Sequence, residues 1–228
     1  MWSGLLGGDV IRWILAHRCP PGPLKSYYQT DTPTLDTPYT RAEFLAVDLE
    51  TTGLDRHRDD IVSIGFVPIV AGRVRLADAE HHLVRPQQPV SDAAAKIHGL
   101  LDDRLAAADP LAAALPRLLK AMTGRIPVAH HTAVERTFLS RACRDLFGHR
   151  LAVPWICTLA LARRRAVRHG AAIPDGALRL GACREVYGMP RHHSHNALSD
   201  ALACAELFLA QAAESSGRKP VALRDLIT

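Results

Sequence analysis

The stretch FLAVDLETTGLD, residues 44 to 55, carries the strongest indication of fold in this sequence. Its first residues are apolar and lie between polar segments, which predicts a buried strand beginning at Phe44. Asp48 and Glu50 stand two residues apart in that strand, so both side chains should project from one face of a sheet. Gly53 then allows the chain to turn.

Asp48 and Glu50 are the first candidate functional residues. Two neighbouring anions at the end of an apolar strand repel each other, and bound cations would remove that cost. Mg²⁺ and Mn²⁺ prefer carboxylate oxygens as ligands and are therefore the expected cations. The alternative is an exposed edge strand on which both carboxylates are solvated, and a D-x-E triplet alone leaves the two interpretations open.

The chain around this strand indicates an α/β or α+β domain. The runs IVSIGFVPIV and RVRLADAEHHLV predict two further strands, separated by Ala71 and Gly72, and IPVA predicts a short one at 126 to 129. Helical periodicity predicts helices at about 91 to 97, 109 to 121, 132 to 147, 156 to 168, 177 to 187 and 196 to 214. Strands first and helices later favour one core covered by helices.

The main domain is expected to occupy residues 41 to 214. Residues 1 to 40 should form an arm with a short helix at about 9 to 18 and a Pro-rich linker, which could dock onto a partner protein or pack onto the chain's own core. Residues 215 to 228 form a short tail. No apolar run approaches the roughly 18 to 20 residues of a membrane span, and no secretion signal is recognisable, so we expect a cytoplasmic protein.

The charge balance suits a polyanionic partner. The formal net charge is +5 and the isoelectric point is about 9.2. Lysine and arginine that neutralise phosphates release counterions, so a basic protein is favoured to bind nucleic acid. The run RRRAVRH, residues 163 to 169, could follow a phosphate backbone or be a solvated helix end. The oligomeric state cannot be read from these features.

The segment VAHHTAVERTFL, residues 128 to 139, supplies a third candidate carboxylate, Glu135. A short apolar strand runs into a helix whose apolar face includes Phe138 and Leu139. Glu135 lies beside that face and could point toward the end of the sheet. The alternative is a solvated glutamate on the outer face of the helix.

The segment RHHSHNALSDALACAELFL, residues 191 to 209, supplies a histidine and a fourth carboxylate. His195 falls in a polar loop before a helix, with Ser194 or Asn196 available as N-cap. Asp200 falls in the first turn of that helix, where the helix dipole favours a negative charge. A histidine there can move a proton near neutral pH.

A zinc site made of His192, His193 and His195 is the competing interpretation. No cysteine or other fourth ligand stands at a typical zinc spacing from them. The five cysteines lie far apart without a CxxC pair, which indicates reduced thiols in a cytosolic protein.

Taken together, the three segments resemble the DnaQ-like 3′-to-5′ exonucleases of the DEDDh type, a family that includes RNase T and the epsilon proofreading subunit of bacterial DNA polymerase III. The likeness covers about residues 42 to 212, because IVSIG, the IHGL at 97 to 100 and the CTLALARR at 157 to 164 also look like that family. The resemblance implies a ribonuclease H-like mixed β-sheet flanked by α-helices in a single domain.

The resemblance also implies roles for the candidate residues. Asp48, Glu50 and Asp200 match metal ligands, and His195, five positions before Asp200, matches the general base. The family usually has HN-x-x-F-D in its second motif, where this chain has His131, Val134 and Glu135. Glu keeps the charge but is one methylene longer than Asp, which puts the occupancy of a second metal in doubt.

The implied reaction is hydrolysis with two divalent cations, Mg²⁺ or Mn²⁺, which releases nucleoside 5′-monophosphates from single-stranded 3′ ends. Likeness to the epsilon subunit favours DNA over RNA. The positions that would contact the terminal nucleotide are Thr51, Thr52, Leu54 and His98. The alternative is that Glu135 disables the site, which would leave a protein that binds nucleic-acid ends or serves as a structural subunit.

Overall fold

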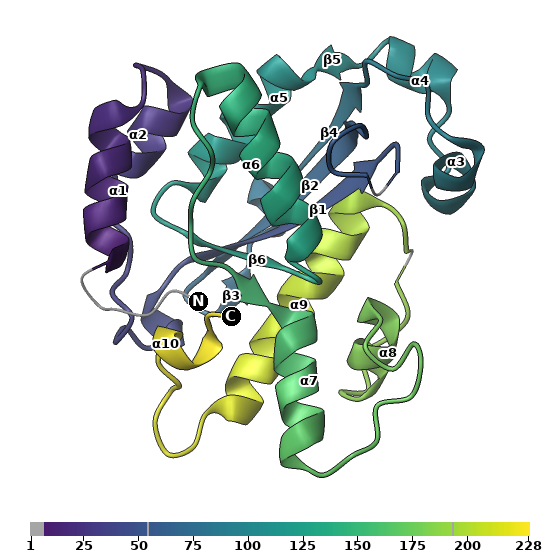
Figure 1. The fold of residues 1–228 in the computed structure, drawn as a ribbon. Coiled ribbons are helices and arrows are strands. Elements are labelled where there is room, and N and C mark those ends of the chain that lie inside the picture. Colours follow the sequence, from purple (N-terminus) through teal and green to yellow (C-terminus); the bar gives the residue numbers. More distant parts are fainter. Residues whose placement is uncertain (1–6, 54, 193) are drawn as a thin grey trace.

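A mixed seven-stranded sheet forms the centre of the computed structural model, which describes residues 7 to 53, 55 to 192 and 194 to 228 (Figure 1). Six strands follow the order β5-β4-β2-β1-β6-β7, and β3 pairs with β2. β1 is antiparallel to β2 and parallel to β6. The strands are β1 (Phe44–Thr51), β2 (Ile61–Val70), β3 (Arg73–Val74), β4 (Glu80–Arg85), β5 (Asp109–Pro110), β6 (Ile126–Ala129) and β7 (Ile156–Cys157).

Helices surround this sheet (Figure 1). They are α1 (Gly7–Arg18), α2 (Pro23–Gln29), α3 (Asp92–His98), α4 (Asp102–Ala106), α5 (Leu111–Met122), α6 (Ala133–Phe147), α7 (Thr158–Arg168), α8 (Leu180–Glu185), α9 (Ala197–Ser215) and α10 (Leu223–Leu226). Two short 3₁₀ helices span Tyr39–Arg41 and Leu76–Asp78. In the described part of the chain, no helix combines the length and apolar character needed to cross a membrane.

The alternation of side chains along β1 divides the core into two layers. Leu45, Val47 and Leu49 pack into a cluster that includes residues of α2, α5 and α6. Phe44 and Ala46 point to the opposite face and pack against α7, α9 and α10. Both faces of β1 are therefore covered by helices, which confirms the predicted α/β class and the flanked mixed sheet.

Two sequence-based expectations about the elements were wrong. The run at 73 to 84 is not one strand: β3 ends after two residues, a 3₁₀ turn follows, and β4 begins at Glu80. The turn is closed by a hydrogen bond from the Asp78 amide to the Arg75 carbonyl, so this part of the chain leaves the ladder. The helix expected from 177 to 187 is confined to Leu180–Glu185.

Residues 7 to 30 pack onto the sheet domain by way of α2. Leu24, Tyr27 and Tyr28 are buried in the same cluster as α5. The Tyr28 hydroxyl donates to the Arg150 carbonyl at 2.9 Å and accepts the Ala152 amide at 2.8 Å. A Pro-rich composition gave no sign of this helix, because prolines at its start suit a first helical turn as well as a linker.

Candidate active site

Asp48 and Glu50 lie on one face of a central strand. β1 stands between β2 and β6, so the edge-strand interpretation of these carboxylates is wrong. Asp48 is opposite Gly65 of β2 and Glu50 is opposite Ser63, while Leu49 between them is buried on the other face. Both carboxylates are half-buried, which makes their charges costly without a counter-charge.

The start of α9 brings Asp200 to the same place. Asn196 is the N-cap, and its side-chain oxygen accepts the Ser199 amide at 3.1 Å. The helix can approach β2 because residue 65 is glycine: a Cβ there would overlap with the backbone of Ala197 and Leu198. Gly65 was not recognised as a site-forming residue from the sequence, although a glycine inside a strand is a known sign of close backbone approach.

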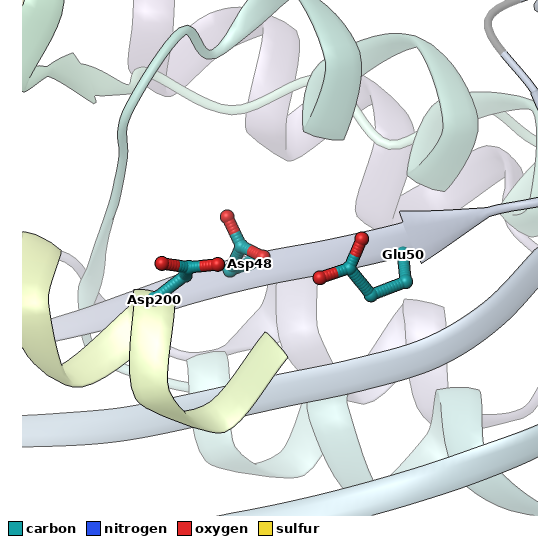
Figure 2. Close-up of side chains that lie close together, drawn as sticks. All are labelled: Asp48, Glu50 and Asp200. Atoms are coloured by element: carbon teal, nitrogen blue, oxygen red, sulfur yellow. The ribbon is translucent and has the colours of Figure 1, made fainter. Parts of the chain in front are cut away.

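Oxygens of Asp48, Glu50 and Asp200 all lie within 4.8 Å of one another. Figure 2 shows the three carboxylates gathered beside β1, with Asp200 reaching in from α9. Burial, followed by the charges of Glu135, Asp200 and Glu50, raises the pKa of Asp48 well above its usual range. Burial and the charge of Asp200 raise the pKa of Glu50 to about 7. Closely spaced carboxylates of this kind fit a divalent cation, which prefers several anionic oxygens.

Glu135 is buried rather than solvated. Only 3% of its surface is exposed, so the outer-face interpretation of this residue is wrong. Its Oε2 atom has no hydrogen-bond partner among the described residues, and burial raises the pKa of the carboxyl to about 8. Its charge also contributes to the raised pKa of Asp48. A buried oxygen without a donor can be satisfied by a cation, so Glu135 fits the role of an additional ligand.

Two histidines hold the carboxylate of Asp200. His195 has a left-handed backbone, with φ of 64°, and its amide donates to Asp200 Oδ2 at 2.7 Å. His192 Nε2 lies 2.7 Å from Asp200 Oδ1. His192 was expected only as a member of the alternative zinc site, and its contact with Asp200 was not predicted because no spacing rule in the sequence indicates it. His193, the third member of that zinc alternative, lies outside the described residues.

A cleft of about 1180 Å³ opens beside the carboxylates. Asp48, Asp200, His131 and His195 line it, together with Arg179 near the start of α8. His195 is exposed and lines this cleft. The cleft can therefore admit a ligand that contacts both the carboxylates and a histidine.

The residues predicted to contact a nucleotide differ in how far their polar groups are already hydrogen-bonded within the protein. Thr52 is held within the protein: its amide donates to the Asp60 carbonyl, and its carbonyl oxygen accepts the Ser91 hydroxyl. Thr51 is buried, and its hydroxyl donates to the Gly53 carbonyl at 2.6 Å. His98 Nδ1 accepts the Leu100 amide at 3.1 Å, and burial lowers the pKa of the imidazole although a hydrogen bond with the Thr51 backbone acts in the opposite direction. Leu54 lies outside the described residues.

The metal-free protein is expected to lose stability as pH rises. The folded state binds the protons of Glu50 and Glu135 more tightly than the unfolded chain, because burial raises both pKa values above the usual 4.5. Their contribution is complete below about 4.5 and is lost progressively as pH passes about 7 for Glu50 and about 8 for Glu135. Thermal unfolding in EDTA should show this decline, and Mn²⁺ should reverse it most strongly at high pH.

Glu135→Gln is the matched variant for this experiment, since the amide cannot titrate. It should flatten the part of the decline nearest pH 8. A melting temperature that neither falls with pH in EDTA nor rises with Mn²⁺ would contradict the interpretation of these carboxylates as cation ligands.

Known proteins share this sequence pattern. A protein-family model described as Exonuclease (RNase_T) matches residues 45 to 208. A DNA polymerase III PolC-type protein of Thermotoga petrophila is 32% identical over 174 residues, which is 76% of this chain and 12% of that protein. A DNA polymerase III subunit epsilon-like protein of Rhodobacter capsulatus is 34% identical over 177 residues, which is 76% of this chain and 24% of that protein. The chain spans about a quarter or less of both relatives.

Solved structures share the fold. Exonuclease X, solved in complex with 5′ overhanging duplex DNA, superposes with a TM-score of 0.59 and 25% identity over 80% of this chain and 98% of that one. The nuclease domain of 3′hExo, a DEDDh family member bound to rAMP, gives a TM-score of 0.64 over 78% of this chain and 96% of that one. At 17% identity, the second likeness is one of fold alone.

Proposed function

We propose that this chain, which belongs to the exonuclease family, removes nucleotides one at a time from the 3′ ends of nucleic acid. The family model spans all three motifs from Asp48 to Asp200, so the family read from the sequence is confirmed. The 3′-to-5′ direction, the DEDDh subtype and a preference for single-stranded DNA over RNA are parts of the proposal. The observation that carries it is the meeting of carboxylates from β1 and α9 beside an open cleft, with Glu135 of α6 buried near enough for its charge to raise the pKa of Asp48.

The proposed metal ligands are Asp48, Glu50, Asp200 and Glu135, which would hold two divalent cations, Mg²⁺ or Mn²⁺. When bound, such cations make a water molecule more acidic and neutralise the charge that builds up on the phosphate during hydrolysis. Asp200 would be kept in place for this by its contacts with His192 and with the amide of His195. Glu135 would reach the cluster from α6 with the oxygen that has no other partner.

His195 is the proposed general base. His195 lines the cleft, where its imidazole would take a proton from the attacking water while the water oxygen bonds to phosphorus. The bond from phosphorus to the 3′ oxygen then breaks, and that oxygen takes up a proton. The products are a nucleoside 5′-monophosphate and a strand one nucleotide shorter with a new 3′ hydroxyl group.

One time course tests this function directly. Single-stranded DNA, duplex DNA and short RNA, each labelled at either end, are incubated with Mg²⁺, Mn²⁺ or EDTA. We expect mononucleotides from 3′ ends only, fastest from single-stranded DNA, and none in EDTA. Tight binding of ends without any release of nucleotides would reject the enzymatic function and leave an end-binding module.

His195→Ala is expected to lower the rate by about 10²- to 10⁴-fold, the usual cost of losing an acid-base group. The low-pH limb of the rate profile should change as well, since the group that must be unprotonated is gone. The expectation is checked by measuring the rate across pH for this variant and for the control His169→Ala. His169 is exposed and does not line the cleft. An unchanged pH profile in His195→Ala would exclude it as the base.

A protein partner and a phosphate backbone at the basic run remain predictions. The outer face of α1 presents Val10 and Trp13, which are 52% and 62% exposed. This face is the proposed contact of the N-terminal arm with a protein partner. Trp2, which the same expectation included, lies outside the described residues. Two arginines of the basic run at 163 to 169 already have partners within the protein. Arg164 donates to the Asp225 carbonyl, and Arg165 forms an ion pair with Glu214.

A further inference from the structure

A second groove, of about 670 Å³, lies along the outer face of α6. Its walls come from α6, from Arg56 and His57 in the loop after β1, and from residues 150 to 155, which run beside α6 in Figure 1. Basic side chains are prominent in its lining: Arg56, His57, Arg136, Arg141, Arg144 and Arg150. None of the described residues that line the groove is a carboxylate. We call it the arginine groove.

Three arginines of the arginine groove are without an acidic partner. Arg141 donates to the carbonyls of Arg56 and Asp59 and so fixes the loop, and Arg144 pairs with Asp145 at 3.0 Å. In contrast, no ion pair with a described residue involves the three remaining members, Arg56, Arg136 and Arg150. Grouped guanidinium ions repel one another, so an anion with several oxygens would be attracted to this groove.

The arginine groove and the active-site cleft approach each other at the start of α6. Ala133, the first residue of α6, lines the groove, and His131, two residues earlier, lines the cleft. Arg136 and Arg144 stand eight positions apart on α6, which at 1.5 Å per residue corresponds to about 12 Å along the helix. Phosphates of one B-form strand are about 3.4 Å apart along the axis. Those of an extended single strand are further apart, so this length can face two or more phosphates.

We propose that the arginine groove binds the phosphate backbone of the nucleic-acid substrate beyond the nucleotide that is being removed. This inference rests on the proposed function, because it assigns the groove to the same substrate. It predicts that long substrates bind more tightly than dinucleotides and that part of this advantage depends on salt. It also predicts that the base sequence in the groove matters little, since guanidinium groups there would contact phosphates only.

The test uses the full chain with Arg56, Arg136 and Arg150 replaced together by Gln. Binding of a long dye-labelled oligonucleotide and of a dye-labelled dinucleotide is measured by anisotropy in EDTA, so that the result does not depend on catalysis. The triple variant should bind the long strand roughly 10- to 100-fold more weakly at about 0.1 M salt, and its salt slope should fall by about 2, or 0.7 for each lost phosphate contact. Dinucleotide binding should stay the same.

The matched control replaces Arg41, Arg73 and Arg218 by Gln, which removes the same charge from exposed positions that line neither the cleft nor the arginine groove. Equal loss of affinity in both triple variants would reject the groove and indicate a general charge effect. Unchanged affinity in the groove variant would reject it as well. Failure of the proposed function is seen separately, as absence of nucleotide release by the wild-type protein in Mn²⁺.

Discussion

Asp48→Asn is expected to lower the exonuclease rate by at least about 10³-fold, which corresponds to roughly 4 kcal/mol of transition-state stabilisation. Asp48 is in contact range of Glu50 and Asp200, with oxygens inside 4.8 Å of theirs, so its loss would remove a ligand at the centre of the cluster. Folding should not suffer. Burial and three neighbouring charges already raise the pKa of this carboxyl, so a neutral amide relieves repulsion.

Rates of nucleotide release and melting temperatures in EDTA check both parts of this expectation. Asp78→Asn, in an exposed turn outside the cleft, is the control and should keep full activity. Asp200→Asn should be as inactive as Asp48→Asn but less stable, because it also disturbs the contacts with His192 and the His195 amide. Wild-type activity in Asp48→Asn would disprove the metal-dependent mechanism proposed for this site.

Gly65→Val is expected to destabilise the protein by at least about 3 kcal/mol, which is the upper end of ordinary overpacking. A side chain at residue 65 would meet backbone atoms of Ala197 and Leu198, and backbone cannot rotate away as a side chain can. For a chain of this size, the melting temperature should fall by about 6 to 12 °C. The start of α9 would be pushed from the sheet, and Asp200 would move with it.

Gly217→Ala provides the comparison, since a Cβ at residue 217 meets nothing within 4 Å. Calorimetry of both variants, together with Mn²⁺ titration, separates the two consequences of the Gly65 change. We expect weaker Mn²⁺ binding in Gly65→Val even at temperatures where it is folded. A Gly65→Val protein with the wild-type melting temperature would show that α9 does not need this close approach.

Much of the fold and of the candidate site follows from local patterns. Alternation in β1 places Asp48 and Glu50 together, and the N-cap at Asn196 places Asp200 in the first turn of its helix. Both are short-range relations, which a sequence expresses directly. The meeting of these residues could be predicted only through family resemblance, because no local rule relates positions about 150 residues apart.

The features that were missed depend on tertiary contacts. Tyr28 is buried because it packs in one cluster with α5 and bonds to the segment after α6. The proline-rich sequence around Tyr28 does not indicate this burial. The contact of His192 with Asp200 depends on how an irregular loop folds back. The arginine groove combines Arg56 with residues more than 75 positions later in the chain. No continuous run of basic residues in the sequence could therefore predict it.

The hydroxyl of Tyr28 ties the amino-terminal segment to the wall of the arginine groove, since its two partners are the backbones of Arg150 and Ala152. A shortened protein starting near residue 41 would keep every candidate metal ligand but would leave this wall unsupported. It would also expose the apolar core residues against which Leu24 and Tyr27 pack. Such a truncation would be a poor substitute for the 228-residue chain in any test of the arginine groove, however normal its metal affinity. Through Tyr28, residues 7 to 30 thus support one wall of the arginine groove.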